Sequence, residues 1–179
     1  MTRASFVAAL GLLSLAVPLG AQGGPSPAAP SRDTVLAAAR EIMADARFCT
    51  FVTVGLDGHP QARVVDPFTP EGQMTVWLAT KPTTRKVAQI RADPRVTLLY
   101  FDAGTASYVT LVGHAELARD PVEKAKRWKP AWSGMYEDEN RGEDYLLIRV
   151  RVDRLEIVSG RHGLRNDPKT WRPVILQFR

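Results

Sequence analysis

The sequence contains a single cysteine, Cys49, among its 179 residues. One cysteine excludes an internal disulfide, so packing, helped by dimerisation, has to hold the fold together. Cys49 lies in a β-rich segment, and we interpret it as a small buried hydrophobe rather than as a catalytic thiol.

Residues that bind metals or form catalytic groups are also sparse. The three histidines, His59, His114 and His162, are scattered, and no two of them stand at the spacing of metal ligands. The chain shows neither an assignable Ser-His-Asp arrangement nor a carboxylate pair. We therefore expect no metal site, and the sequence assigns no side chain as a catalytic acid, base or nucleophile.

The one apolar run near the start, residues 6–19, is shorter than the ~20 residues that a membrane-spanning helix needs. It follows Arg3 and precedes Gly20, Ala21 and Gly23, a pattern typical of an export signal. We predict a signal peptide over residues 1–23, a flexible linker over 24–32 and cleavage between Gln22 and Ser26.

The leader lacks an Arg-Arg pair before the run and a cysteine near the cleavage zone, which argues against the twin-arginine route and against a lipoprotein anchor. The expected destination is the periplasm or the extracellular space, reached by the Sec route, with no stable membrane anchor. The alternative is a buried N-terminal helix in a cytoplasmic protein.

The positive charge of the chain is diffuse, and the one mostly acidic stretch, residues 137–144, is expected to be a solvated loop. The formal charge is +5, and no repeat of aromatic and basic residues suggests a nucleic-acid surface. A diffuse positive charge suits anionic small molecules. With 45% hydrophobic and 24% charged residues, the chain has the composition of one soluble domain, which we place at 33–179 with a C-terminal tail at 160–179.

Short β-rich segments bounded by turn signals fill most of that domain. We expect strands at 48–56, 61–66, 74–79, 96–101, 107–117 and 145–158. Helices are expected from Ser31 or Asp33 to Ala46, from Thr83 or Thr84 to Asp93, and from Asp120 or Pro121 to about 129. This order predicts a mainly β (α+β) fold, a six-stranded antiparallel split barrel with peripheral helices.

Three local features refine this prediction. Asp57-Gly58 is a turn signal between the first two strands. In the last strand the apolar positions change from even to odd numbers, which predicts a bulge near Asp153-Arg154. Glu123 stands four residues before Arg127, and we expect a surface ion pair worth about a few tenths of a kcal/mol.

Residues 79–86, Ala-Thr-Lys-Pro-Thr-Thr-Arg-Lys, join a strand end to the first turn of a helix. Hydroxyl groups, cations and free N–H groups at a helix start favour a phosphate. We predict that Thr84, Arg85 and Lys86 form such a site. The alternative is a capped surface helix with solvated cations, and Arg63 taken alone would be an ordinary strand residue.

Taken in order, these elements resemble the pyridoxamine-5'-phosphate-oxidase-like FMN-binding split barrels, over residues 48–159. Residues 86–96, 108–116 and 146–150 are similar to the general-stress-protein branch of that superfamily. The resemblance implies that Arg63, Val64 and Val65 lie along the flavin, that Ala79 and Thr80 follow at a strand end, and that Thr84, Arg85 and Lys86 hold the FMN phosphate. It also implies a homodimer with the cofactor at its interface, where Trp132 is a candidate contact from the second subunit; Trp128 is expected to pack inside.

The chain departs from true pyridoxamine phosphate oxidases at three places. Phe68 stands where they carry Lys, and Tyr108 stands where they carry a flavin-contacting Gln. Their Arg-x-His motif has only an echo in Arg161-His162. We therefore predict an FMN-dependent oxidoreductase that is not a vitamin B6 oxidase. The alternative is a non-catalytic protein that binds or senses FMN, the deazaflavin F420 or haem; substrate and electron donor stay open.

Overall fold

The computed structural model of the protein describes residues 29–178. The predicted signal peptide and the first part of the linker lie outside these residues. The described chain begins with helix α1 (Arg32–Ala46), followed by the hairpin strands β1 (Cys49–Val54) and β2 (Pro60–Val65). The remaining elements are β3 (Val76–Thr80), α2 (Arg85–Ala92), β4 (Arg95–Asp102), β5 (Ser107–Ala118), α3 (Pro121–Lys126), η1 (Pro130–Trp132), β6 (Leu146–Val158) and β7 (Val174–Gln177).

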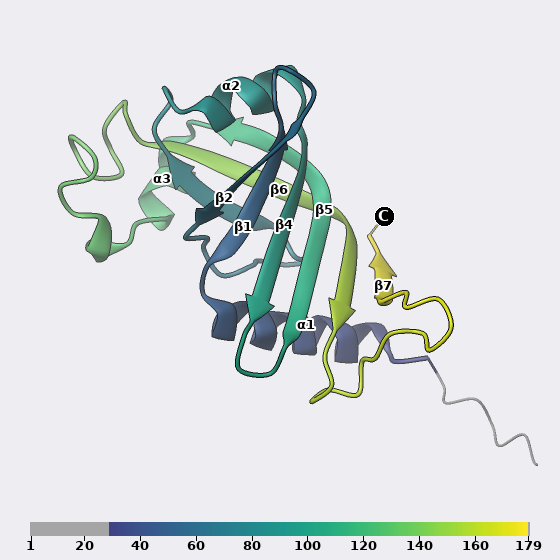
Figure 1. Ribbon diagram of the computed structural model, residues 1–179. Coiled ribbons are helices and arrows are strands. Elements are labelled where there is room, and N and C mark those ends of the chain that lie inside the picture. Colours follow the sequence, from purple (N-terminus) through teal and green to yellow (C-terminus); the bar gives the residue numbers. More distant parts are fainter. Residues whose placement is uncertain (1–28, 179) are drawn as a thin grey trace, which may run out of the picture.

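The strands form one antiparallel sheet in the order β2-β1-β4-β5-β6-β3, with β7 paired to β6. Edge strands β2 and β3 do not pair with each other, so the sheet remains open between them. Helix α1 crosses one end of the sheet and α2 lies at the opposite end (Figure 1). The predicted split barrel with peripheral helices is confirmed, with seven strands instead of six. The additional strand, β7, lies in the segment that we expected to be only a tail.

The predicted bulge is present in β6. Val112 of β5 pairs with Arg154, whereas the next residue, Gly113, pairs with Val152, so Asp153 has no partner across the strand. A Cβ atom on Gly113 would lie 2.0 Å from the backbone oxygen of Arg151. Glycine is therefore required opposite the bulge, where the two backbones approach each other.

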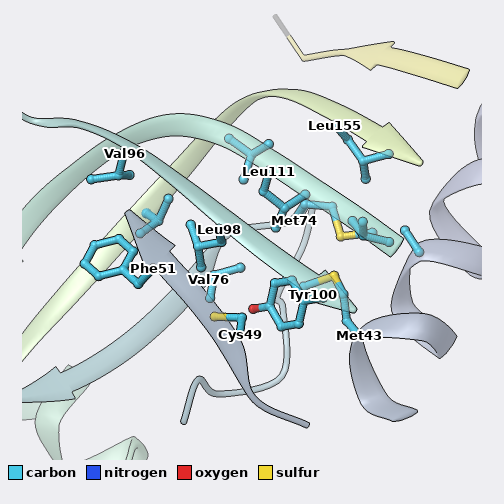
Figure 2. Packing of buried hydrophobic residues seen from close by; sticks show 14 of the residues in the cluster. Met43, Cys49, Phe51, Met74, Val76, Val96, Leu98, Tyr100, Leu111 and Leu155 are labelled. Carbon is cyan, nitrogen blue, oxygen red and sulfur yellow. The ribbon is translucent and has the colours of Figure 1, made fainter. Parts of the chain in front are cut away.

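The larger of two apolar clusters in the described chain fills the space between the sheet and α1. The apolar face of α1 that its spacing predicts is buried, and it packs against inward residues of β1, β3, β4 and β5 (Figure 2). Fully buried members include Ile42, Phe51, Met74 and Leu98. Ser31 caps α1, because its hydroxyl accepts a hydrogen bond from the amide of Thr34 at 3.1 Å.

Cys49 is buried in this core, as predicted, and burial raises the pKa of its thiol to about 12. A thiol in that state is a poor nucleophile.

The Glu123–Arg127 pair does not lie on the surface as expected. Arg127 is only 4% exposed, and its guanidinium contacts both carboxylate oxygens of Glu71 as well as Glu123. Helix α3 ends at Lys126, about three residues earlier than predicted, and Arg127 then turns inward over the ring of Trp77 at 3.9 Å. The pattern of one helix could not show this, because Glu71 lies in the segment before β3 and Trp77 lies in β3, both far from Arg127 in the sequence.

Candidate functional site

The junction between β3 and α2 brings four of the predicted site residues together. Thr80 is buried at the end of β3, and Lys86 Nζ donates to its hydroxyl oxygen at 2.9 Å. The hydroxyl groups of Thr80 and Thr84 lie 3.0 Å apart. Thr84 is the N-cap residue of α2, but its hydroxyl donates to the carbonyl of Lys81 at 2.9 Å instead of capping the helix. The amide of Val87 donates to the carbonyl of Thr84 at 3.0 Å, and the amides of Arg85 and Lys86 are left for another acceptor.

Arg63 of β2 reaches the same region from the other edge of the sheet. Its guanidinium donates to Thr53 Oγ1 at 2.7 Å and to Gln89 Oε1 of α2 at 3.0 Å. Thr53 also donates to Gln89 at 2.6 Å. Because this small polar network joins β1, β2 and α2, the position of Arg63 is fixed against the helix start.

Three positive charges therefore gather at one end of the open barrel. The pKa of Lys86 is lowered mainly by burial and, to a smaller extent, by the charge of Arg63. The pKa of Arg63 is lowered in the same way, mainly by burial and then by the charge of Arg85. Within residues 29–178 none of these three cations, Arg63, Arg85 and Lys86, has a carboxylate at ion-pair distance. Cations that repel one another without an acidic partner are suited to binding an anion.

Val64 and Val65 continue the edge strand away from this cluster. Val64 is 71% exposed, whereas Val65 is half-buried and packs against the core. Strand β2 pairs only with β1, so its outer edge presents unpaired backbone groups. The structure thus leaves these backbone groups free for a ring lying along the strand, as the resemblance implies.

Trp132 belongs to a second apolar cluster, built around Trp77 of β3, Leu147 of β6 and Tyr145. Its ring packs edge-to-face against Phe68 and Trp128, with centroids 5.5 and 6.2 Å apart. Ala79 packs against the same cluster, so the two predicted residues share one neighbourhood. The expected packing role of Trp128 is confirmed, and within one subunit Trp132 packs in the same way.

One polar chain was not anticipated from the sequence. Ser107 donates to Ser159 at 2.9 Å, the hydroxyl oxygen of Ser159 lies 2.8 Å from His162 Nδ1, and His162 Nε2 lies 3.0 Å from Glu41. Both serines are fully buried, so no substrate reaches their hydroxyl groups. This series of hydrogen-bonding side chains joins α1 to the ends of β5 and β6, and its role is to stabilise the fold. Its residues are spread between positions 41 and 162 of the sequence, so no local sequence pattern reveals that they are in contact.

The described residues offer neither a metal site nor a membrane-spanning helix. Residues 29–178 contain no group of three or more His, Cys, Asp or Glu side chains placed to hold a metal ion. No helix among them has the length and apolar character needed to cross a bilayer.

The open antiparallel barrel and the cationic helix start define a small split-barrel protein with a positively charged end. The family model described as pyridoxamine 5'-phosphate oxidase matches residues 35–159, which is more than half of the chain. The chain therefore belongs to the pyridoxamine 5'-phosphate oxidase family. No curated protein matches it.

Solved structures share this fold at low sequence identity. A protein related to general stress protein 26 from Clostridium acetobutylicum is 17% identical, with a TM-score of 0.68 over 83% of this chain and 97% of its own. General stress protein 26 from Bacillus anthracis is 19% identical, with a TM-score of 0.61 over 78% and 98%. A heme binding protein from Mycobacterium smegmatis is 24% identical, with a TM-score of 0.55 over 68% of this chain and 52% of its own.

Proposed function

We propose that the protein is a flavoprotein that binds FMN by its phosphate at the β3–α2 junction. The observation that carries the proposal is the group of Arg63, Arg85 and Lys86, which have no carboxylate partner at ion-pair distance in residues 29–178. Thr80 and Thr84 add hydroxyl groups beside these charges. Arg85 is exposed, so its guanidinium is free to grip two phosphate oxygens.

The rest of the cofactor would follow β2. The N–H groups of successive residues alternate between the two sides of a strand, so Arg63 and Val65 bond to β1 and Val64 presents its N–H at the open edge. An N–H group at this position stabilises negative charge on a flavin ring that lies along Arg63, Val64 and Val65. Bound FMN would supply electron transfer, and the protein would supply binding and orientation. We infer an FMN-dependent oxidoreductase that does not oxidise vitamin B6, because Phe68 and Tyr108 replace the Lys and Gln of the true oxidases.

We further propose that FMN lies at the interface of a homodimer, so that a second copy of Trp132 can approach the ring. Export by the Sec route, with cleavage between Gln22 and Ser26, is proposed from the pattern of the first residues. N-terminal sequencing of the exported protein tests the cleavage; a sample that retains Met1 would contradict it.

The alternative function is binding or sensing without catalysis, of FMN, a deazaflavin or haem. The replaced substrate residues Phe68 and Tyr108 favour it, and so does the fold shared with the heme binding protein of Mycobacterium smegmatis. A phosphate grip without substrate contacts fits storage as well as catalysis.

The visible spectrum of the purified protein, taken with a steady-state assay using NAD(P)H and an electron acceptor, separates these functions. The proposal predicts the two absorption bands of an oxidised flavin, bleached when NAD(P)H is added and restored by the acceptor. Flavin bands without turnover support the binding protein. A haem band, or no colour after reconstitution with FMN, rejects the flavoprotein.

A further inference from the structure

A cavity of about 360 Å³ lies at the end of the barrel opposite α2. Its walls are the second half of α1, the connection between β2 and β3, Tyr100 of β4 and the segment after α3. None of the residues assigned above to the FMN site lines it. Its volume falls at the lower end of the ~300–1,000 Å³ that small-molecule sites occupy.

The charge of this cavity is positive. Arg40, Arg47 and Lys129 line it together with a single acid, Asp66. Lys129 Nζ lies 2.6 Å from Asp66, so these two charges neutralise each other. In the described chain Arg40 donates only to uncharged acceptors, which are the carbonyl groups of Pro70 and Gly72 and the sulfur of Met74. Among residues 29–178 neither Arg40 nor Arg47 has a carboxylate partner. Two positive charges are therefore left without compensation.

A buried hydroxyl whose one polar neighbour in the described chain is a thiol lies at the same wall. Tyr100 is 1% exposed, and its oxygen has no hydrogen-bonding nitrogen or oxygen within residues 29–178. It lies beside the thiol of Cys49 (Figure 2), and Cys49 pairs across the strands with Val65, the residue before Asp66. Burial raises the pKa of Tyr100, so the hydroxyl stays a neutral donor. A thiol is only a weak hydrogen-bonding partner, and buried polar groups without a strong partner often mark a place for a ligand or water.

The remaining walls are mostly apolar, with Thr69 as the one polar residue; the apolar ones are Met43, Ala44, Pro67, Phe68, Pro70 and Ala131. We propose that this cavity is a second binding site, separate from the FMN site, for a small organic anion with a carboxylate or phosphate group on an apolar body. Arg40 and Arg47 bind the acidic group, and the apolar walls enclose the body. The site needs no flavin.

Two fluorescent probes test this proposal on the full purified chain. Anilinonaphthalene sulfonate carries an acidic group on an aromatic body, and N-phenylnaphthylamine has the same body without the charge. We expect the sulfonate to bind more tightly and to remain bound in saturating FMN. The double variant Arg40→Gln/Arg47→Gln should lose about tenfold or more in sulfonate affinity, the usual effect of losing contacts to a charged group. Its affinity for the neutral probe should not change.

The matched control is Arg119→Gln/Arg151→Gln, which removes two exposed arginines outside the cavity. Because Arg40 also holds the connection at Gly72, Arg47→Gln alone and the thermal unfolding midpoint of each variant show whether folding is affected. Competition by benzoate and by phenyl phosphate identifies the preferred acid. Equal affinity of the double variant and the wild type, equal loss for both probes, or displacement by FMN would each overturn the proposal.

Discussion

Arg85 and Lys86 stand in the first turn of a surface helix, so their removal should affect the ligand far more than the fold. We predict that Arg85→Ala/Lys86→Ala weakens FMN binding about tenfold to hundredfold, because one hydrogen bond to a charged group contributes roughly 1.5–3 kcal/mol. Riboflavin, which has no phosphate, should bind the variant and the wild type alike. Fluorescence titration of the apo-protein with both ligands measures the difference.

The control is Arg91→Ala, an exposed arginine in the last turn of the same helix. Arg63→Ala should behave differently, because Arg63 also holds Phe51, Thr53 and Gln89 in place. That variant should lose stability and bind both ligands less well. If the double variant binds FMN and riboflavin as the wild type does, the cations of α2 are solvated and the phosphate site is wrong.

The second prediction concerns Lys86 and the dependence of FMN affinity on pH. Burial and the nearby Arg63 lower its pKa from the ordinary 10.5, so Lys86 loses its charge earlier than other lysines as the pH rises. FMN affinity should therefore begin to fall at a pH below 10.5. Between the lowered pKa of Lys86 and 10.5, this lysine holds more protons in the unfolded chain than in the native apo-protein. The contribution of Lys86 to the free energy of unfolding of the apo-protein should therefore increase as the pH rises through this range.

FMN titration and thermal unfolding from pH 7 upward measure the two opposite trends. Lys86→Arg should remove the fall in affinity over this window, because arginine remains charged. A pH profile of affinity that is the same for Lys86→Arg and the wild type would exclude Lys86 as the titrating group.

Single residues were predictable from the sequence where their role is local. Ser31 caps α1 and Thr84 precedes α2 as expected, since both positions follow from neighbours within four residues. Arg127 shows the opposite case, because its partner Glu71 is fifty-six positions away in the sequence. The cavity beside Tyr100 could not be predicted either, since its walls come from four separate segments.

At the scale of elements, periodicity was informative where strands are long. The change of parity in β6 located the bulge at Asp153, because a strand has only two faces and the core occupies one of them. Strand β7 was missed because it has only four residues, Val174–Gln177, and follows a segment rich in turn residues. Its pairing with residues 154–157 is a tertiary contact that a short apolar run does not specify.

Arg127 joins α3 to the β3 edge, and we predict that Arg127→Ala destabilises the protein by roughly 1–3 kcal/mol. Breaking a buried ion pair costs about 3–5 kcal/mol, but here both acids are partly exposed and regain water. Loss of the stacked contact with Trp77 adds to the effect. Urea unfolding of the described domain measures it.

Arg119→Ala is the matched control, because Arg119 pairs with the almost fully exposed Glu143. Exposed pairs of this kind contribute about 0–1 kcal/mol. Equal small effects of the two substitutions would mean that Arg127 is not structurally important despite its burial.

At the scale of the whole molecule, one face of the sheet carries exposed apolar side chains. Val64 is 71% exposed, Leu99 38% and Phe101 55%. Thr50 of β1 pairs with Val64 of β2 on one side and with Leu99 of β4 on the other. Val64 and Leu99 therefore lie in one row that crosses the three strands. A row of this kind on a sheet face is typical of an interaction surface, and the face adjoins the edge strand where we place the flavin.

We predict that this face forms the homodimer and that Leu99→Lys/Phe101→Lys, which leaves the proposed flavin contact Val64 in place, produces a monomer at micromolar concentration. Two lysines would place like charges opposite each other across a symmetric interface and leave their charges buried. The monomer should remain folded, since both side chains are exposed, and it should bind FMN more weakly, because the second subunit is expected to complete each site. Sedimentation measures the assembly and titration measures the affinity. Val122→Lys/Ile175→Lys, which changes exposed apolar residues on α3 and β7, should leave both unchanged. A wild-type protein that sediments as a monomer would rule out the interface, and a monomeric variant with full FMN affinity would show that each subunit holds the cofactor alone.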